Sequence, residues 1–210
     1  MIKILIADDH AVVRHGLKQI ITDEKDMIVA GEAENAAQVL QLLGGENFNV
    51  IILDITMPGR SGLDLLPEIK DLRPAAKILI LSMHAEEQFA IRALKSGASG
   101  YITKQSAPTE LIRAIRKVQS GSKYISQSIA EQLAFFLSDD DNKPQHEKLS
   151  DREFQVLRMI AMGKILREIA DELVISEKTV STYRARILEK MNMKRNAELI
   201  RYAVQKKLIE

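Results

Sequence analysis

Short apolar runs alternate with amphipathic stretches over about the first 120 residues of the chain. Runs of four to six mostly apolar residues are typical of parallel strands, because both faces of such a strand are buried. Five runs, each followed by a stretch of helical periodicity, predict an open, doubly wound α/β sheet. The expected strands are Ile2–Ala7, Met27–Gly31, Val50–Asp54, Lys77–Ser82 and Gly100–Thr103, and the expected helices are Val13–Ile21, Ala36–Leu43, Gly62–Leu72, Glu87–Ser96 and Thr109–Gln119.

A polar segment separates this region from the rest of the chain. Ser138–Lys148 has nothing to bury in a core, which predicts a tether, and Ser126–Leu137 before it has the apolar spacing of a helix. The pattern after the tether is helical to the end. We therefore expect an α/β domain over residues 1–122, a linker of a helix and a polar tether over 123–146, and an all-α four-helix domain over 147–210.

Composition narrows the class of protein. Cysteine is absent, which excludes disulfides and thiolate metal sites. No apolar run approaches the roughly 18 residues that span a bilayer, and the early acids Asp8 and Asp9 do not fit a signal peptide. These features predict a cytoplasmic protein without a membrane partner. Ser176–Lys207 holds nine Lys/Arg against three Asp/Glu, which favours a polyanionic partner for the second domain, although a solvated helix surface gives the same count.

Polar side chains stand where the expected strands end. Asp8 and Asp9 follow the first strand, Asp54 ends the third, Ser82 ends the fourth, and Lys104 follows the fifth. Ligands of doubly wound sheets bind at the carboxyl ends of the strands, so these side chains are expected to converge at one rim.

Carboxylates held this close repel one another unless a proton or a divalent cation lies among them. An all-oxygen cluster without His or Cys suits Mg²⁺. With Mg²⁺ and Lys104 neutralising phosphoryl oxygens, Asp54 is placed to attack phosphorus as a nucleophile. Taken singly, each residue has a simpler role: Asp9 as a helix cap, Ser82 as a partner of the backbone and Lys104 as a solvated loop residue.

The second domain carries clear helix boundaries. Ser150 and Glu153 form the pattern of a capping box, and Gly163 is suited to end the helix that they start. Arg167–Leu173 is expected as a short second helix, followed by a turn at Val174 and Ile175. The third helix is expected over Glu177–Met191 behind a Ser176 cap, and the fourth over Ala197–Lys207 behind an Asn196 cap.

Two helices joined by a tight turn, the second of them basic, predict a helix-turn-helix that reads double-stranded DNA in the major groove. The alternative is a four-helix module that docks on another protein. The residues expected to contact DNA are Lys178, Thr179, Ser181, Thr182, Arg184, Arg186 and Lys190.

The strand-end residues resemble the receiver domain of response regulators, which has a flavodoxin-like sheet of strand order 2-1-3-4-5. The resemblance rests on Asp8-Asp9-His10, Asp54-Ile55-Thr56-Met57-Pro58-Gly59, Ser82 and Lys104. It implies that a sensor histidine kinase phosphorylates Asp54 and that Mg²⁺ is bound by Asp9, Asp54 and the Thr56 carbonyl, with Asp8 assisting through water. It also implies that Lys104 stabilises the phosphoryl group and that Ser82 and Tyr101 move to report phosphorylation. Many receivers follow the lysine with proline; here Gln105 stands there, which leaves open whether the Lys104–Gln105 bond is cis.

The second domain resembles the LuxR-type helix-turn-helix through Leu149-Ser150-x-Arg152-Glu153-x-x-Val156-Leu157, Glu168-Ile169-Ala170-x-x-Leu173 and Ile175-Ser176-x-Lys178-Thr179-Val180. The whole chain is thereby similar to a NarL/FixJ-type response regulator. That family implies a homodimer on promoter DNA, paired through Ala197, Ile200, Arg201 and Val204 of the last helix. One departure is Ile165-Leu166, where family members often have a polar cap; its loss weakens the helix start by about 1 kcal/mol.

The resemblance makes the chain a transcription regulator switched by phosphorylation of Asp54, not an enzyme beyond its own phosphorylation and dephosphorylation. Two alternatives share parts of the pattern. A phosphatase or phosphotransferase would use Asp54 for turnover, but Thr56 stands where a second acid is needed. A constitutive DNA-binding or adaptor protein would not need the acidic pair, Ser82 and Lys104.

Overall fold

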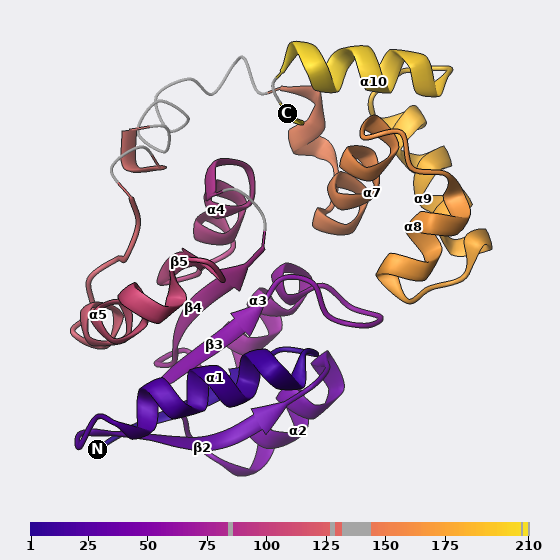
Figure 1. Cartoon of the computed structure of the whole chain (residues 1–210). Helices are drawn as coiled ribbons and strands as arrows, with labels where there is room; N and C mark the ends of the chain where they lie inside the picture. Colours follow the sequence, from indigo (N-terminus) through magenta and orange to yellow (C-terminus); the bar gives the residue numbers. More distant parts are fainter. Residues whose placement is uncertain (84–85, 127–128, 132–143, 207, 210) are drawn as a thin grey trace. The chain divides into compact units, whose positions relative to one another are not determined.

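The computed structural model describes residues 1–83, 86–126, 129–131, 144–206 and 208–209 (Figure 1). The chain divides into two compact units, Met1–Phe135 and Phe136–Glu210. Most of the helix expected over Ser126–Leu137 and most of the tether over Ser138–Lys148 lie outside the described residues; residues 129–131, which are described, are helical. Within the described ranges, no helix has both the length and the apolar character needed to cross a membrane.

The first unit is built on a five-stranded parallel sheet of order β2-β1-β3-β4-β5. This confirms the predicted topology. β1 and β3 lie side by side, with Ala7 opposite Leu53, so the residues that follow both strands emerge at the same rim. The strands are β1 (Ile2–Ala7), β2 (Met27–Ala33), β3 (Val50–Asp54), β4 (Lys77–Ser82) and β5 (Gly100–Thr103).

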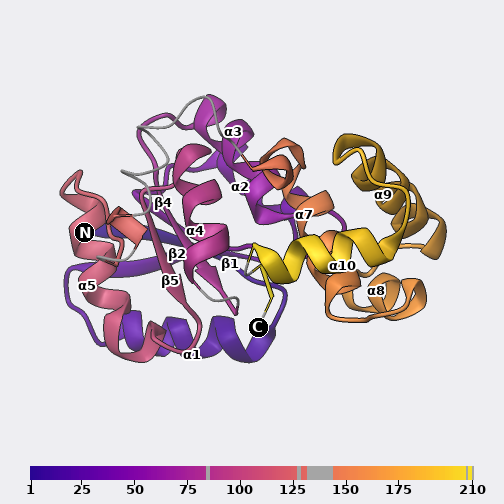
Figure 2. The same cartoon turned by 90° about the horizontal axis from the view of Figure 1, so that it is seen from above.

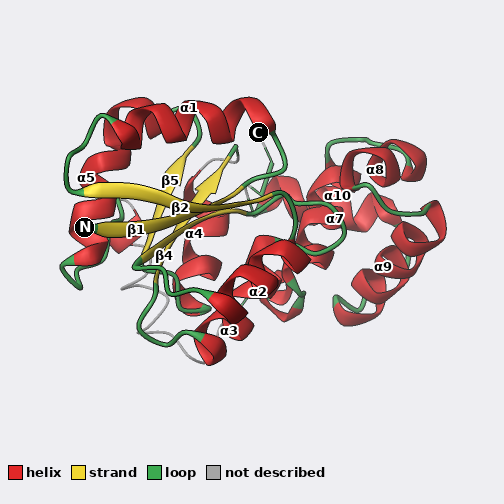
Figure 3. Cartoon of the chain, turned by 90° about the horizontal axis from the view of Figure 1, so that it is seen from below, coloured by secondary structure: helices red, strands yellow, loops and turns green. Residues whose placement is uncertain are grey.

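Helices cover both faces of the sheet. Seen along the sheet, α1 and α5 lie on one face and α2, α3 and α4 on the other (Figures 2 and 3). The apolar core under α1 and α5 includes Ile4, Ile52 and Leu81 from the strands, with Leu17 and Leu111 from the helices. The helices are α1 (Ala11–Thr22), α2 (Ala36–Gly45), α3 (Gly62–Leu72), α4 (Glu86–Lys95) and α5 (Ala107–Gln119).

One glycine is required by a close approach between α3 and the end of β3. A Cβ atom on Gly62 would lie 2.0 Å from the carbonyl oxygen of Asp54, so no larger residue fits without moving the backbone. The amide of Gly62 donates to the carbonyl of Ile55 at 2.9 Å. Gly62 therefore joins α3 directly to the segment that presents Asp54.

The second unit is helical. Its first long helix begins where predicted, because Ser150 accepts from the Glu153 amide while Glu153 accepts from the Ser150 amide. Gly163 follows that helix with φ +86, as expected of a residue that ends a helix. The elements are the 3₁₀ turn η1 (Gln145–Lys148), α7 (Asp151–Ala161), α8 (Leu166–Leu173), α9 (Glu177–Lys190) and α10 (Asn196–Gln205).

Two predictions for this unit are wrong. Asn196 does not cap α10; it is the first residue of the helix, after Arg195, and its Oδ1 accepts from Arg184 Nε at 2.7 Å. The polar tether does not extend to Lys148, because η1 packs on the helices. The ring of His146 stacks on Phe154 at 5.6 Å, and its Nδ1 lies 2.9 Å from the Tyr202 hydroxyl. The polar sequence predicts nothing to bury in this segment, but an aromatic contact and a hydrogen bond hold it.

The start of α8 replaces only part of the missing polar cap. Ile165 supplies no side-chain hydrogen bond, but Glu168 accepts from the Ile165 amide at 2.9 Å. At the other end of α8, Val174 has a left-handed conformation with φ 52 and is 64% exposed. A β-branched residue rarely adopts this conformation, so the turn before α9 carries local strain.

Candidate functional site

The structure brings the predicted acids together at the carboxyl rim of the sheet. Asp8 follows β1 and is fully buried, and Asp54 ends β3 and is 1% exposed. Asp9 is partly exposed beside them. One side-chain oxygen each of Asp8, Asp9 and Asp54, together with a ring nitrogen of His10, lie within 4.8 Å of one another. This cluster has the size and the donors of a metal site.

Lys104 links two of these carboxylates. Its Nζ lies 2.7 Å from Asp8 Oδ2 and 3.0 Å from Asp54 Oδ2, and only 8% of its side chain is exposed. Its amide donates to the carbonyl of Ser82 at 2.8 Å, which fixes the loop after β5 to the end of β4. The Lys104–Gln105 bond is trans, so this placement needs no cis peptide.

Burial raises the pKa of the Asp54 carboxyl from its ordinary value of 3.8 to about 6, while Lys104 opposes the rise and Asp8 adds to it. Burial also acts to lower the pKa of Lys104, but Asp54 and Asp8 outweigh burial and raise it. At the rim, ionisation of the Asp54 carboxyl is therefore unfavourable, and the Lys104 cation is held beside it. Such a pair binds added positive charge or an anionic group on phosphorus.

The other predicted residues around Asp54 take the following positions. The Thr56 amide donates to Asp54 Oδ1 at 3.2 Å. Ser82 is fully buried at the end of β4, and Tyr101 is 1% exposed, pairing with Ile80 across β4 and β5. Asp9 does not cap α1, because the residue at the N-cap is His10.

Sequence reasoning missed two residues of the rim. His10 brings a nitrogen into a cluster predicted to hold oxygen alone; the signal was its position directly after Asp8 and Asp9. Arg14, buried on α1, donates through Nη1 to the Asp8 carbonyl at 2.7 Å and through Nη2 to Glu34 at 2.5 Å. A buried arginine on an otherwise apolar face was the signal for that contact.

The second candidate surface is the polar side of α9. Val180, Ile187 and Met191 are buried. The residues predicted to contact DNA lie on the other sides: Lys178, Ser181, Thr182, Arg186 and Lys190 are exposed, and Thr179 and Arg184 are half-buried.

Two of these cations also have partners inside the second unit. Lys190 Nζ lies 2.6 Å from Glu153 Oε2, and the side chain of Glu153 is 3% exposed. Arg184 donates to Asn196, as described above. Both contacts join α9 to another helix, so these two side chains stabilise the domain whatever else they bind.

Comparisons with known proteins agree with both halves of this description. A model of the response regulator receiver domain matches residues 4–116, and one of bacterial regulatory proteins of the luxR family matches residues 147–203. The chain is a response regulator of the NarL/FixJ family. It is thus a two-component, DNA-binding transcription regulator.

Named relatives match this regulator over nearly its full length. It is 35% identical to the response regulator UvrY of Escherichia coli over 206 residues, which covers 98% of this chain and 94% of UvrY. It is 38% identical to the oxygen regulatory protein NreC of Staphylococcus epidermidis, covering 99% of each chain. Among solved structures, the RcsB response regulator of Salmonella typhimurium has a TM-score of 0.63 and 28% identity, over 97% of this chain and 100% of that one.

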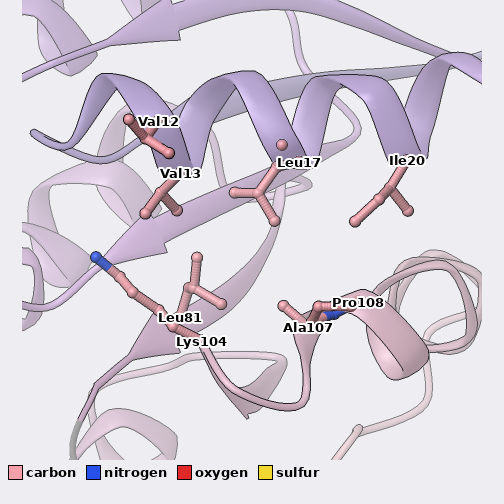
Figure 4. Close-up of a pocket in the computed structure, with 9 residues that line it drawn as sticks. Val12, Val13, Leu17, Ile20, Leu81, Lys104, Ala107 and Pro108 are labelled. Carbon is pink, nitrogen blue, oxygen red and sulfur yellow. The ribbon is translucent and has the colours of Figure 1, made fainter.

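Beside its acidic rim, the regulator has an apolar pocket of about 170 Å³ between α1 and the start of α5 (Figure 4). Val12 lies at the edge of this pocket, three residues after Asp9, and is 85% exposed. An exposed apolar side chain next to the rim is suited to contact a partner that approaches Asp54. The pocket is lined by Val12, Val13, Gly16, Leu17, Ile20, Leu81, Lys104, Ala107 and Pro108.

The last helix of the regulator also presents apolar side chains to solvent. On α10, Leu199 and Ala203 are buried, while Ile200 is 37% and Val204 is 59% exposed. Ala197 and Arg201 are exposed as well. The four residues predicted to form the dimer contact therefore share the outer side of α10.

Proposed function

We propose that this regulator accepts a phosphoryl group on Asp54 from a sensor histidine kinase, with Mg²⁺ bound at the rim. Phosphorylation then controls binding of a homodimer to promoter DNA through α9. Because that DNA lies in the bacterial cytoplasm, the regulator acts there. The observation that carries the proposal is the contact of Lys104 with both Asp8 and Asp54, beside a cluster that fits a metal.

The phosphoryl transfer assigns a role to each residue of the rim. An oxygen of Asp54 attacks phosphorus, the phosphorus–nitrogen bond of the kinase phosphohistidine breaks, and the acyl phosphate stays on Asp54. Lys104 is placed to balance the charge of the phosphoryl oxygens. Asp9, Asp54 and the Thr56 carbonyl would hold Mg²⁺, with Asp8 behind them. Bound Mg²⁺ supplies positive charge to the oxygens on phosphorus.

The regulator's own chemistry is limited to forming and hydrolysing this acyl phosphate. The signal leaves the rim through Ser82 and Tyr101, both buried next to the β4–β5 edge. A phosphoryl group beside Ser82 favours a rearranged state of this edge, and a bias of a few kcal/mol shifts such an equilibrium.

The output rests on the exposed polar side of α9. Lys178, Thr179, Ser181, Thr182, Arg184, Arg186 and Lys190 would contact phosphates and base edges. Structures of RcsB include that protein bound to DNA, and bound to a promoter in the presence of the phosphomimetic BeF₃⁻. Ala197, Ile200, Arg201 and Val204 on α10 would pair two copies.

The domain limits that go with this function are 1–122 for the receiver and 147–210 for the DNA-binding domain, with 123–146 between them. The 3₁₀ turn η1 lies across the second limit and accompanies the DNA-binding domain.

The test is phosphoryl labelling of the full-length protein. With acetyl phosphate and Mg²⁺, the wild type is expected to take up one phosphoryl group and to bind promoter DNA more tightly. Asp54→Asn should take up none, because the nucleophile is gone. Asp71→Asn, an exposed acid on α3, is the matched control and should label like the wild type.

Label on Asp54→Asn would show that another residue is the acceptor. Sustained turnover of a small phosphate ester by the wild type would favour the phosphatase alternative. A Val12→Lys variant separates the kinase from the chemistry: it should label normally with acetyl phosphate and poorly with phosphorylated kinase, since only the kinase contacts the α1 surface.

A further inference from the structure

His10 lies among the acids of the receiver rim. It is the N-cap residue of α1, with extended φ −87 and ψ 107, directly after Asp8 and Asp9. Its Nδ1 is 2.7 Å from Asp9 Oδ1 and 3.2 Å from Asp8 Oδ1. Its amide donates to the same Asp8 oxygen at 2.8 Å, which holds the backbone so that the ring faces the carboxylates.

These spacings match the coordination sphere of a small divalent ion. With metal–ligand distances of about 2.1 Å, neighbouring ligands of an octahedral ion lie about 3 Å apart and opposite ligands about 4.2 Å apart. The distances from His10 Nδ1 to Asp9 Oδ1 and Asp8 Oδ1, 2.7 and 3.2 Å, are close to the spacing of neighbouring ligands. The four donor atoms of Asp8, Asp9, His10 and Asp54 all lie within 4.8 Å, close to the spacing of opposite ligands. An ion among these atoms would contact the imidazole nitrogen as well as carboxylate oxygens.

We propose that His10 is a ligand of the receiver metal, and that its nitrogen makes the site, which also accepts Mg²⁺, bind a first-row transition ion such as Mn²⁺ more tightly. The inference rests on the proposed function, because it concerns the same metal site. Imidazole is a preferred donor for transition ions, whereas Mg²⁺ prefers oxygen and water. Asp9, Asp54 and the Thr56 carbonyl would be the other protein ligands.

A different role for His10 is to hold Asp8 by the hydrogen bond at 3.2 Å, without touching the metal. The two roles differ in one measurable property. A ligand transfers electron density from nitrogen to the ion, whereas a hydrogen-bond partner of Asp8 leaves the ion surrounded by oxygen. Mn²⁺ is the suitable probe because its unpaired electrons couple to a directly bound nitrogen.

The experiment is electron spin echo spectroscopy of Mn²⁺ bound to the full-length protein. The wild type is expected to show the ¹⁴N modulation of a coordinated imidazole. His10→Asn should lose the modulation, and its preference for Mn²⁺ over Mg²⁺ should fall about tenfold in competition titrations. His15→Asn is the matched control: this exposed histidine lies on α1 outside the cluster, so both readouts should stay at the wild-type level.

The possible failures are distinct. Nitrogen modulation that is absent from the wild type, while Mn²⁺ binding is still lost in Asp54→Ala, overturns the role of His10 and leaves the proposed site in place. Mn²⁺ binding that does not depend on Asp54 overturns the proposed metal site as well. The wild-type spectrum needs no variant, and because the His10 side chain is 61% exposed, His10→Asn should fold like the wild type.

Discussion

In the receiver, Asp8 and Asp54 are 0% and 1% exposed, whereas Lys178, Ser181 and Arg186 of α9 face solvent. The buried acids depend on one another, since Lys104 contacts both, and Lys104 and Asp8 both change the pKa of Asp54. The exposed residues of α9 have few shared partners. The receiver site should therefore respond to substitution as a unit, and the α9 surface should respond as a sum of separate contributions.

The largest expected effect on stability concerns Lys190 of α9, which has a partner on α7 and so departs from the additive behaviour expected of the α9 surface. Glu153→Ala removes both the capping box of α7 and the buried partner of Lys190, so it should lower the free energy of unfolding of the second unit by about 2–4 kcal/mol. Lys190→Met, which keeps the capping box, should cost only about 1 kcal/mol because Lys190 is 41% exposed. Denaturant titration of both variants measures the difference, and equal losses would assign the effect to the ion pair alone.

The same pair gives a pH dependence. Burial raises the pKa of Glu153, but the hydrogen bond from Lys190 and the contacts with Ser150 outweigh it, and the net pKa is lowered. A carboxyl with a lowered pKa in the folded state adds stability above its unfolded pKa, and this stability is lost as pH falls through the folded pKa. The acid sensitivity of the second unit should accordingly be smaller in Glu153→Ala.

Asp54 should give the receiver a dependence of stability on pH that is opposite in sign to that of Glu153, and Asp54→Asn should remove it. Because the pKa of Asp54 rises from 3.8 to about 6 on folding, its ionisation opposes folding, and stability falls as pH rises between those values. The variant should be more stable than the wild type by about 3 kcal/mol at pH 7, in the absence of a divalent metal, and equal to it near pH 3. Thermal melts across this range measure the change. If Asp54→Asn is less stable than the wild type at pH 7, ionisation of Asp54 does not oppose folding.

DNA binding should be additive along α9, apart from the residues with internal partners. Arg186→Ala should weaken binding of the phosphorylated protein by about 1–2 kcal/mol and reduce the dependence on salt by about one ion. Lys190→Met should change the salt dependence less, because Glu153 already offsets its charge. Affinity measured at several salt concentrations distinguishes the two, and identical slopes would show that Lys190 leaves Glu153 when DNA binds.

The smallest effect concerns the turn before α9. Val174→Gly should stabilise the second unit by about 1 kcal/mol, because glycine adopts the left-handed conformation freely. Val204→Gly in α10 is the control; it should destabilise by a similar amount, since that valine lies in a regular helix. Hydrogen exchange of the buried amides of α8 and α9 reports both changes. A loss of stability in Val174→Gly would mean that the exposed valine makes a contact worth more than the strain.

Local rules predicted the sheet and the carboxylate rim, because apolar runs make strands and residues after parallel strands meet at one edge. The strand order followed from the resemblance to receiver domains. What these rules missed depends on partners distant in the chain. Asn196 was expected to cap α10, but a bond to Arg184 on α9 takes its side chain. His146 was read as part of a tether, although Tyr202 and Phe154 hold it. His10 is the exception: its partners Asp8 and Asp9 are adjacent in the chain, but it stands at the N-cap of α1 and not at the end of a strand.

The contact between Gly62 and Asp54 has a consequence for engineering receivers. The hydrogen atom of a glycine is all that separates the start of α3 from the carbonyl of the phosphoacceptor. The residue at position 62 therefore sets the position of the loop that carries Asp54. A side chain there would push the nucleophile away from Lys104 without altering any group that takes part in the chemistry. A grafted or redesigned site that copies the acids and the lysine, but not this glycine, would have the right functional groups at the wrong distance.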